Sequence, residues 1–179
     1  MNTLLFHLSQ RSVDSASFKP LNPEAKGPSI RQLQQNLNHR FTALGVLDII
    51  SVQVDGWFGP KTVASVKYLQ CVSGLPVNGQ VDAPTQAFIQ QGAAGLNKLS
   101  LGSAGISVLA LKQVLAVETE IALSQSDWFC QQTEWAVMAY QHKIGLRCDG
   151  IVGAKTWEGI VRSRLSGLPC TALSPNAYY

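Results

Sequence analysis

The chain has 179 residues, of which 46% are hydrophobic and 14% are charged, a balance typical of a globular protein and too poor in charge for a disordered one. Fourteen Lys and Arg residues against eleven Asp and Glu give a net charge of +3. The basic residues are spread along the sequence, without the dense cluster of a nucleic-acid-binding protein. No apolar run approaches the ~18 residues that cross a bilayer. The sequence therefore predicts neither a nucleic-acid partner nor a membrane span.

Residues 1–25 are expected to form a flexible leader, and the first helix follows them. The apolar run from Leu4 to Leu8 is interrupted by His7 and lacks both the basic start and the length of a secretory signal. Beyond it, Ser29 is a candidate helix cap, because its hydroxyl can accept bonds from free N–H groups at a helix start. Helical spacing then places three apolar residues on one face: Ile30, Leu33 and Leu37.

A second helix is predicted after Gly59-Pro60, because proline suits the first turn of a helix, where its missing N–H costs nothing. Its apolar face combines Thr62, Ser65, Val66 and Leu69. Gly74-Leu75 ends this helix, and Asn78-Gly79 forms a turn, since both residues tolerate positive φ. A short third helix is expected from Pro84 to Gln91.

The same pattern returns downstream. Trp57 and Trp128 are separated by 71 positions, as are Thr62 and Thr133, whereas Leu33 and Leu111 are separated by 78. The difference places a surface loop between about residues 41 and 53, because insertions collect in loops. The repeat predicts an all-α fold of two tandem three-helix modules that can share an interface. We assign residues 26–91 to module 1, 92–98 to a linker, 99–165 to module 2 and 166–179 to a tail.

The four cysteines show no CxxC spacing and no partnering histidine cluster, so no zinc site is predicted. They lie at positions 71, 130, 148 and 170. An even count permits two disulfide bonds. We expect single buried thiols instead, because free cysteine commonly behaves as a small buried hydrophobe.

Several sequence motifs in the two units are informative when they are taken in combination. The first unit contains "VDGWFGPKT" and "GLPVNGQVDAPT", and the second contains "LSLGSAG", "TEWAVMAYQ" and "GLRCDGIVGAKTW". In combination they resemble the peptidoglycan-binding domain family, whose three-helix modules commonly stand beside cell-wall hydrolases. The resemblance implies non-catalytic binding of bacterial cell-wall peptidoglycan, through its glycan or its peptide stem. It also implies a location in the cell envelope.

The resemblance implies a shallow ligand site near the loop before the second helix of a module. Aromatic rings stack on sugar faces, and neighbouring carboxylates or amides bind hydroxyl and acetamido groups. The candidate ligand-binding residues are Asp55, Trp57, Gln70, Asn78, Trp128 and Asp149. For Trp57 a place in the core is equally open, while the acidic and amide side chains are also typical turn formers and the glutamine a typical structural hydrogen-bonding residue. Phe58, Phe129, Trp135 and Trp157 are expected to pack internally.

The second unit departs from the first at the proposed site. Ser126-Asp127 replaces Asp55-Gly56, and Lys112 stands where Gln34 does. We therefore expect module 2 to keep the fold while losing ligand contacts.

No catalytic residue, metal ligand or cofactor is predicted. A glycosidase needs two carboxylates that face one bond, and the eleven acidic residues here are dispersed. The histidines, His7, His39 and His142, lack a nucleophile or ligand spacing around them. Two alternatives to direct wall binding remain open. One is a protein-protein interaction module that reuses the fold, which the missing signal peptide favours, and the other is the targeting subunit of a separate cell-wall hydrolase.

Overall fold

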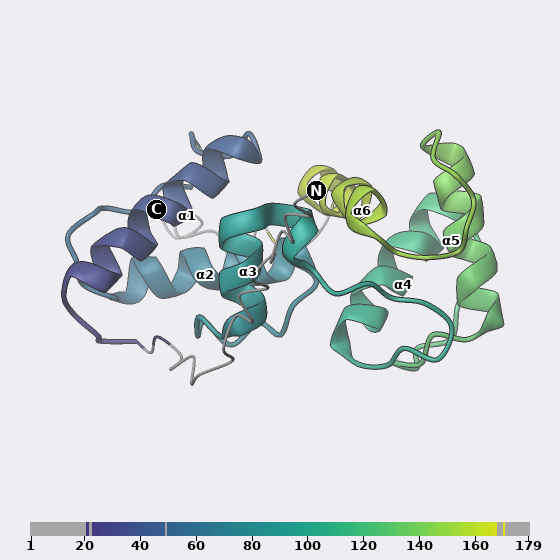
Figure 1. Ribbon diagram of the computed structural model, residues 1–179, viewed down its shortest axis with the longest axis horizontal. Coiled ribbons are helices and arrows are strands. Elements are labelled where there is room, and N and C mark those ends of the chain that lie inside the picture. Colours follow the sequence, from purple (N-terminus) through teal and green to yellow (C-terminus); the bar gives the residue numbers. More distant parts are fainter. Residues whose placement is uncertain (1–20, 22, 49, 168–169, 171–179) are drawn as a thin grey trace, which may run out of the picture.

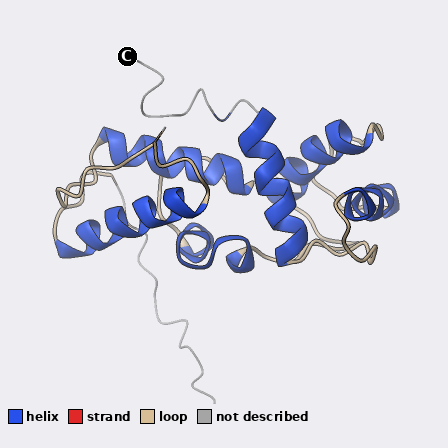
Figure 2. Ribbon diagram, turned by 90° about the horizontal axis from the view of Figure 1, so that it is seen from above, coloured by secondary structure: helices blue, strands red, loops and turns tan. Residues whose placement is uncertain are grey.

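The computed structural model describes residues 21, 23–48, 50–167 and 170 of the chain (Figure 1). Six α-helices and one short 3-10 helix account for its regular structure: α1 (Pro28–Ala43), α2 (Pro60–Ser73), α3 (Ala83–Gln91), η1 (Gly92–Gly95), α4 (Ile106–Thr119), α5 (Gln131–Lys143) and α6 (Ala154–Gly167). Within the described residues there are no strands (Figure 2). The predicted all-α fold of two three-helix modules is confirmed.

The helix boundaries follow local sequence signals, with one exception. Helix α2 begins at Pro60 and ends where Gly74 adopts a left-handed conformation at φ 69°, both as predicted. Helix α1 already begins at Pro28, and its N-cap is Gly27 at φ 127° without a side-chain cap. The prediction that Ser29 caps α1 is therefore wrong, because the preceding proline starts the helix and leaves the serine inside its first turn.

Each module has its own apolar core. In module 1 the predicted apolar faces of α1 and α2 pack together with Phe58 and Phe88. In module 2 the corresponding faces of α4 and α5 pack together with Phe129 and Trp157. These four aromatic side chains are at most 1% exposed. The expectation that Trp135 packs internally is wrong, since its side chain is 61% exposed on α5.

Helix α6 joins the two modules. In Figure 1 it lies between the helices of module 1 and the other two helices of module 2, α4 and α5. Its Trp157 and Ile160 belong to the core of module 2, and its Val161 belongs to the core of module 1. η1 packs against both α3 and α6, so the segment expected to be a linker is itself part of the contact. The modules are thus held together by buried apolar side chains.

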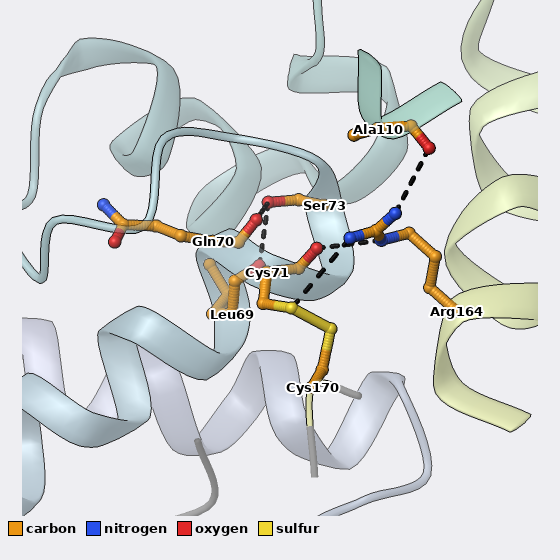
Figure 3. The surroundings of a disulfide bond; sticks show 7 residues. All are labelled: Leu69, Gln70, Cys71, Ser73, Ala110, Arg164 and Cys170. Atoms are coloured by element: carbon orange, nitrogen blue, oxygen red, sulfur yellow. Dashed lines mark hydrogen bonds between the residues drawn. A yellow bond between two sulfur atoms is a disulfide. The ribbon is translucent and has the colours of Figure 1, made fainter. Parts of the chain in front are cut away.

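A disulfide and an arginine reinforce this junction. Cys71 on α2 is bonded to Cys170, 99 residues further on (Figure 3). Arg164 reaches from α6 between the modules, where Nε donates to the carbonyl of Cys71 at 2.9 Å and Nη1 to that of Ala110 at 3.2 Å. The expectation of single buried thiols is wrong for this pair, and also for Cys148, which is exposed.

The ends of the chain are described only in part. Residues 1–20 of the expected leader lie outside the described residues, but Leu21 pairs with Val81 through two backbone hydrogen bonds of 3.2 Å. Of the expected tail, residues 168–169 and 171–179 are likewise outside them. Among the described residues, no helix has the combined length and hydrophobicity that crossing a membrane requires.

Candidate ligand-binding site

A buried glutamine holds the turn between α2 and α3. The Gln70 side chain is fully buried, and its Nε2 lies 3.0 Å from Asn78 Oδ1, 2.8 Å from Gln80 O and 3.1 Å from Thr85 Oγ1. Its Oε1 accepts hydrogen bonds from the backbone N–H groups of Asn78 and Gly79. Gln70 and Asn78, both candidate ligand-binding residues, are thus brought together, and the hydrogen bonds between them are internal to the turn.

A second buried glutamine, Gln34 of α1, holds the loop before α2 through the same kind of side-chain hydrogen bonds. Its Nε2 donates to Asp55 Oδ1 at 2.8 Å and to Trp57 O at 3.0 Å, while its Oε1 accepts from Gly56 N–H at 2.8 Å. Gly56 has φ 77°, and a Cβ there would approach the Arg31 side chain to 3.0 Å. Glycine is therefore needed both for the backbone conformation and for the close approach.

The turn between α5 and α6 has the third such glutamine. Gln141 Nε2 donates to Asp149 Oδ1 at 2.9 Å, and its Oε1 accepts from Gly150 N–H at 3.0 Å. The N–H of Ile151 and the Gln141 amide together hold the pKa of Asp149 below its ordinary value of 3.8. Asp149 is therefore an ionised turn former, equivalent in position to the neutral Asn78.

This difference predicts a pH effect. Because the pKa of Asp149 is lowered in the folded state, its carboxylate contributes stability that is fully present above pH 3.8 and is lost as the pH falls below that value. We expect Asp149→Asn, which copies Asn78, to reduce the loss of unfolding free energy on acidification. Denaturant unfolding of both proteins at a series of pH values measures this pH dependence of the unfolding free energy. Parallel stability curves for the two proteins would contradict the assignment.

In the loop before α5, a lysine takes the place of the buried glutamine found at the other three turns. Lys112 of α4 is only 4% exposed, and its Nζ donates to Ser126 O at 2.9 Å and to Ser126 Oγ at 3.1 Å. Asp127 occupies the position of Gly56. The loop before α5 is therefore held by a buried cation and differs chemically from the loop before α2.

The Trp57 side chain lies at the surface of module 1. It is 43% exposed, and one part of its ring rests on Gly59, where a Cβ would come within 2.8 Å of it. Lys26 Nζ stands 5.8 Å from the ring centroid. An open pocket of about 440 Å³ is lined by Lys26, Gly27, Pro28, Arg31, Asp55, Gly56 and Trp57. Two candidate residues, Asp55 and Trp57, thus meet in one pocket.

The charges of this pocket are set by neighbours that the sequence did not single out. The Gln34 amide, followed by the Trp57 N–H, holds the pKa of Asp55 below 3.8, so its carboxylate is ionised at neutral pH. Lys26 and Arg31 supply the opposite charge. Neither was predicted as a site residue, because each lies in or beside α1 without a motif around it. Gln34 could have been found, since Gln34, Gln70 and Gln141 all precede an Asx-Gly turn.

The equivalent surface of module 2 lacks the two cations of the module 1 pocket. Ala104 pairs with Trp128 as Lys26 pairs with Trp57, which identifies the two positions as equivalent. Trp128 is 53% exposed, yet Leu109 stands at the position of Arg31. Trp128 therefore lies apart from the other candidates, without the cations and the Asp55 carboxylate that flank Trp57.

Comparison with known proteins agrees with this architecture. The chain matches the family model described as "Putative peptidoglycan binding domain" in two segments, residues 26–89 and 105–160. No curated protein and no solved structure matches the chain significantly. Together the matched segments span more than half of the sequence, and each runs from the first helix of a module into its third. The chain therefore belongs to the peptidoglycan-binding domain family, of which it carries two tandem copies.

Proposed function

We propose that this protein binds peptidoglycan without cleaving it, through the module 1 pocket around Trp57. The exposed indole ring carries the proposal, because it is held against Gly59 and flanked by an ionised carboxylate and two cations. An aromatic face offers a platform for a sugar ring, and the charged groups can bind its polar substituents. Among the described residues, the pocket lining has a single carboxylate, Asp55, whereas glycoside hydrolysis needs two.

The other candidates have different roles in this proposal. Gln70, Asn78 and Asp149 shape turns, because their polar atoms hydrogen bond within those turns. Trp128 provides at most a weaker second contact. The disulfide supports a location in the cell envelope, since disulfide bonds persist in oxidising compartments and are rare in the cytosol. It therefore favours wall binding over an intracellular protein partner.

The two modules supply a matched test of the site. We expect Trp57→Ala with Asp55→Asn to weaken retention on insoluble peptidoglycan about tenfold, equivalent to about 1.4 kcal/mol. Asparagine keeps the acceptor that Gln34 uses, as Asn78 does in the next turn. Trp128→Ala with Asp127→Asn is the control and should change retention little. Co-sedimentation measures both.

Thermal unfolding of each variant separates lost binding from lost folding. The proposal is refuted if the folded Trp57 variant sediments normally, or if the Trp128 variant alone abolishes retention. Wild-type protein that stays in the supernatant would refute peptidoglycan binding itself.

A further inference from the structure

A second cavity lies where the two modules meet. It has a volume of about 340 Å³, within the size range of small-ligand sites. Its walls come from α1 and α3 of module 1, from η1 of the segment between the modules, and from α6 of module 2. The side chains that define its chemistry are Arg40, Phe88, Lys155, Glu158 and Arg162. Because both modules contribute, a single copy of the domain would lack this cleft.

Arg40 is fixed in position on the module 1 side. Its Nε donates to Ile89 O at 3.0 Å, and its guanidinium carbon lies 5.9 Å from the centroid of the Phe88 ring. Gly92 has φ 64°, and a Cβ there would come within 2.7 Å of Arg40 Nη1. The backbone of η1 thus makes room for this guanidinium.

The fixed guanidinium retains N–H groups that can donate to a ligand. Among the described residues its hydrogen bonding uses Nε, which leaves the N–H groups of both Nη atoms for a ligand. Partial burial also lowers the pKa of Arg40, because loss of hydration disfavours the charged form. A planar guanidinium held in one orientation is well suited to a two-pronged hydrogen bond with a carboxylate.

The opposite wall adds further positive charge. Lys155 and Arg162 extend from α6. Among the lining residues that the structure describes, the one carboxylate is Glu158, which accepts a hydrogen bond from Arg162 at 2.7 Å. The lining therefore carries three cations and one carboxylate. The remaining lining is mainly small or apolar: Ala43, Leu44, Phe88, Gly92, Ala93, Ala94, Ala154, Val161 and Leu165. Such a site matches a negative group attached to a small apolar body.

We propose that this intermodule cleft binds the terminal carboxylate of a short peptide that ends in a small apolar residue. Arg40 is its principal donor, with Lys155 and Arg162 completing the positive field. The assignment rests on the proposed function only for the origin of the peptide, which would be a stem of the cell wall. One protein would then contact glycan at Trp57 and peptide at the cleft, and two linked contacts strengthen retention without any new interface.

Isothermal titration calorimetry of the full chain with a defined probe tests the cleft. The probe is N-acetyl-alanyl-alanine as the free acid, and its C-terminal amide is the matched control. We expect the acid to bind at least about tenfold more tightly than the amide, because only the acid carries the carboxylate. Equal binding of the two, or no binding of the acid, would overturn the proposal. Displacement of the acid by an equal concentration of inorganic phosphate would show a general anion site and overturn the peptide assignment.

Charge variants locate the binding. Lys155→Gln with Arg162→Gln should weaken binding of the acid about fivefold or more, since both side chains are exposed and can be changed without disturbing a core. Lys98→Gln with Arg147→Gln removes the same charge outside the cleft and should leave binding unchanged. Equal losses in the two double variants would mean long-range attraction only and would refute the location. Arg40→Gln should weaken binding further, with its melting temperature measured alongside.

Ligand binding in the cleft and peptidoglycan binding at the Trp57 pocket can be refuted independently. Trp57→Ala with Asp55→Asn should leave binding of the acid unchanged. If the chain sediments with peptidoglycan but does not distinguish acid from amide, the cleft inference fails and the proposed function stands. If the acid binds in the cleft but the chain does not sediment, the proposed function fails and the cleft retains its ligand chemistry.

Discussion

Loss of the Cys71–Cys170 disulfide is expected to lower the free energy of unfolding by about 4 kcal/mol, since the bond closes a loop of 99 residues. A cross-link that spans so much of the chain removes many conformations from the unfolded state. It also ties the chain beyond α6 to α2, beside the contacts that Arg164 makes with Cys71 and Ala110. Reduction therefore acts at the junction of the two modules.

Denaturant unfolding of oxidised protein and of Cys71→Ser with Cys170→Ser measures this loss. The free cysteines provide the control, because Cys130→Ser with Cys148→Ser removes two thiols and no cross-link. We expect the control pair to remain within about 1 kcal/mol of the wild type. Equal unfolding midpoints for the oxidised protein and the Cys71 variant would show that the bond contributes no stability.

Gln70→Ala is expected to cost about 3 kcal/mol of unfolding free energy. The substitution removes the acceptor for two backbone N–H groups and a donor for Gln80 O, and it truncates a side chain that is fully buried. Each buried polar group left without a partner costs about 1–3 kcal/mol. Gln141→Ala should have a similar effect, because it breaks the equivalent network in module 2.

Gln35→Ala is the matched control for this series. Gln35 is an exposed glutamine on α1, and its truncation should change stability by no more than about 0.5 kcal/mol. A cost below about 1 kcal/mol for both Gln70→Ala and Gln141→Ala would contradict the role of the buried amides. A loss from Gln70→Ala accompanied by weaker retention on peptidoglycan would instead connect the α2–α3 turn with the ligand.

Local pattern was sufficient to predict the helices and their buried faces. Spacing of apolar residues along a helix reports which side faces a core, so Leu33 and Val66 could be assigned before any contact was known. The repeat then implied that module 2 has the same fold. Positive φ at Gly56, Gly79 and Gly150 agrees with the turn chemistry, because Asx-Gly pairs favour such turns whatever surrounds them.

The candidate site was predictable only in part. For the adjacent aromatic residues Trp57 and Phe58, the sequence predicted an internal position for Phe58 but left Trp57 open between core and binding site. In the folded chain Phe58 is 1% exposed and Trp57 43% exposed, because the Gln34 hydrogen bonds orient the loop before α2. Lys26 and Arg31 enter the pocket for the same reason. Their side chains meet Asp55 through the packing of α1 against that loop, a contact that no periodic pattern encodes.

By itself, the sequence determined the all-α class, the two modules, their cores and the residues of the turns, since each depends on interactions within a few helical turns or on a repeated pattern. The tertiary structure alone decided that Cys71 meets Cys170, that α6 serves both cores, and that Arg40 shares a cleft with Arg162. These contacts join segments far apart in the chain. They depend on how the second module docks on the first, which is set by the combined shape and hydrogen bonding of the assembled surfaces.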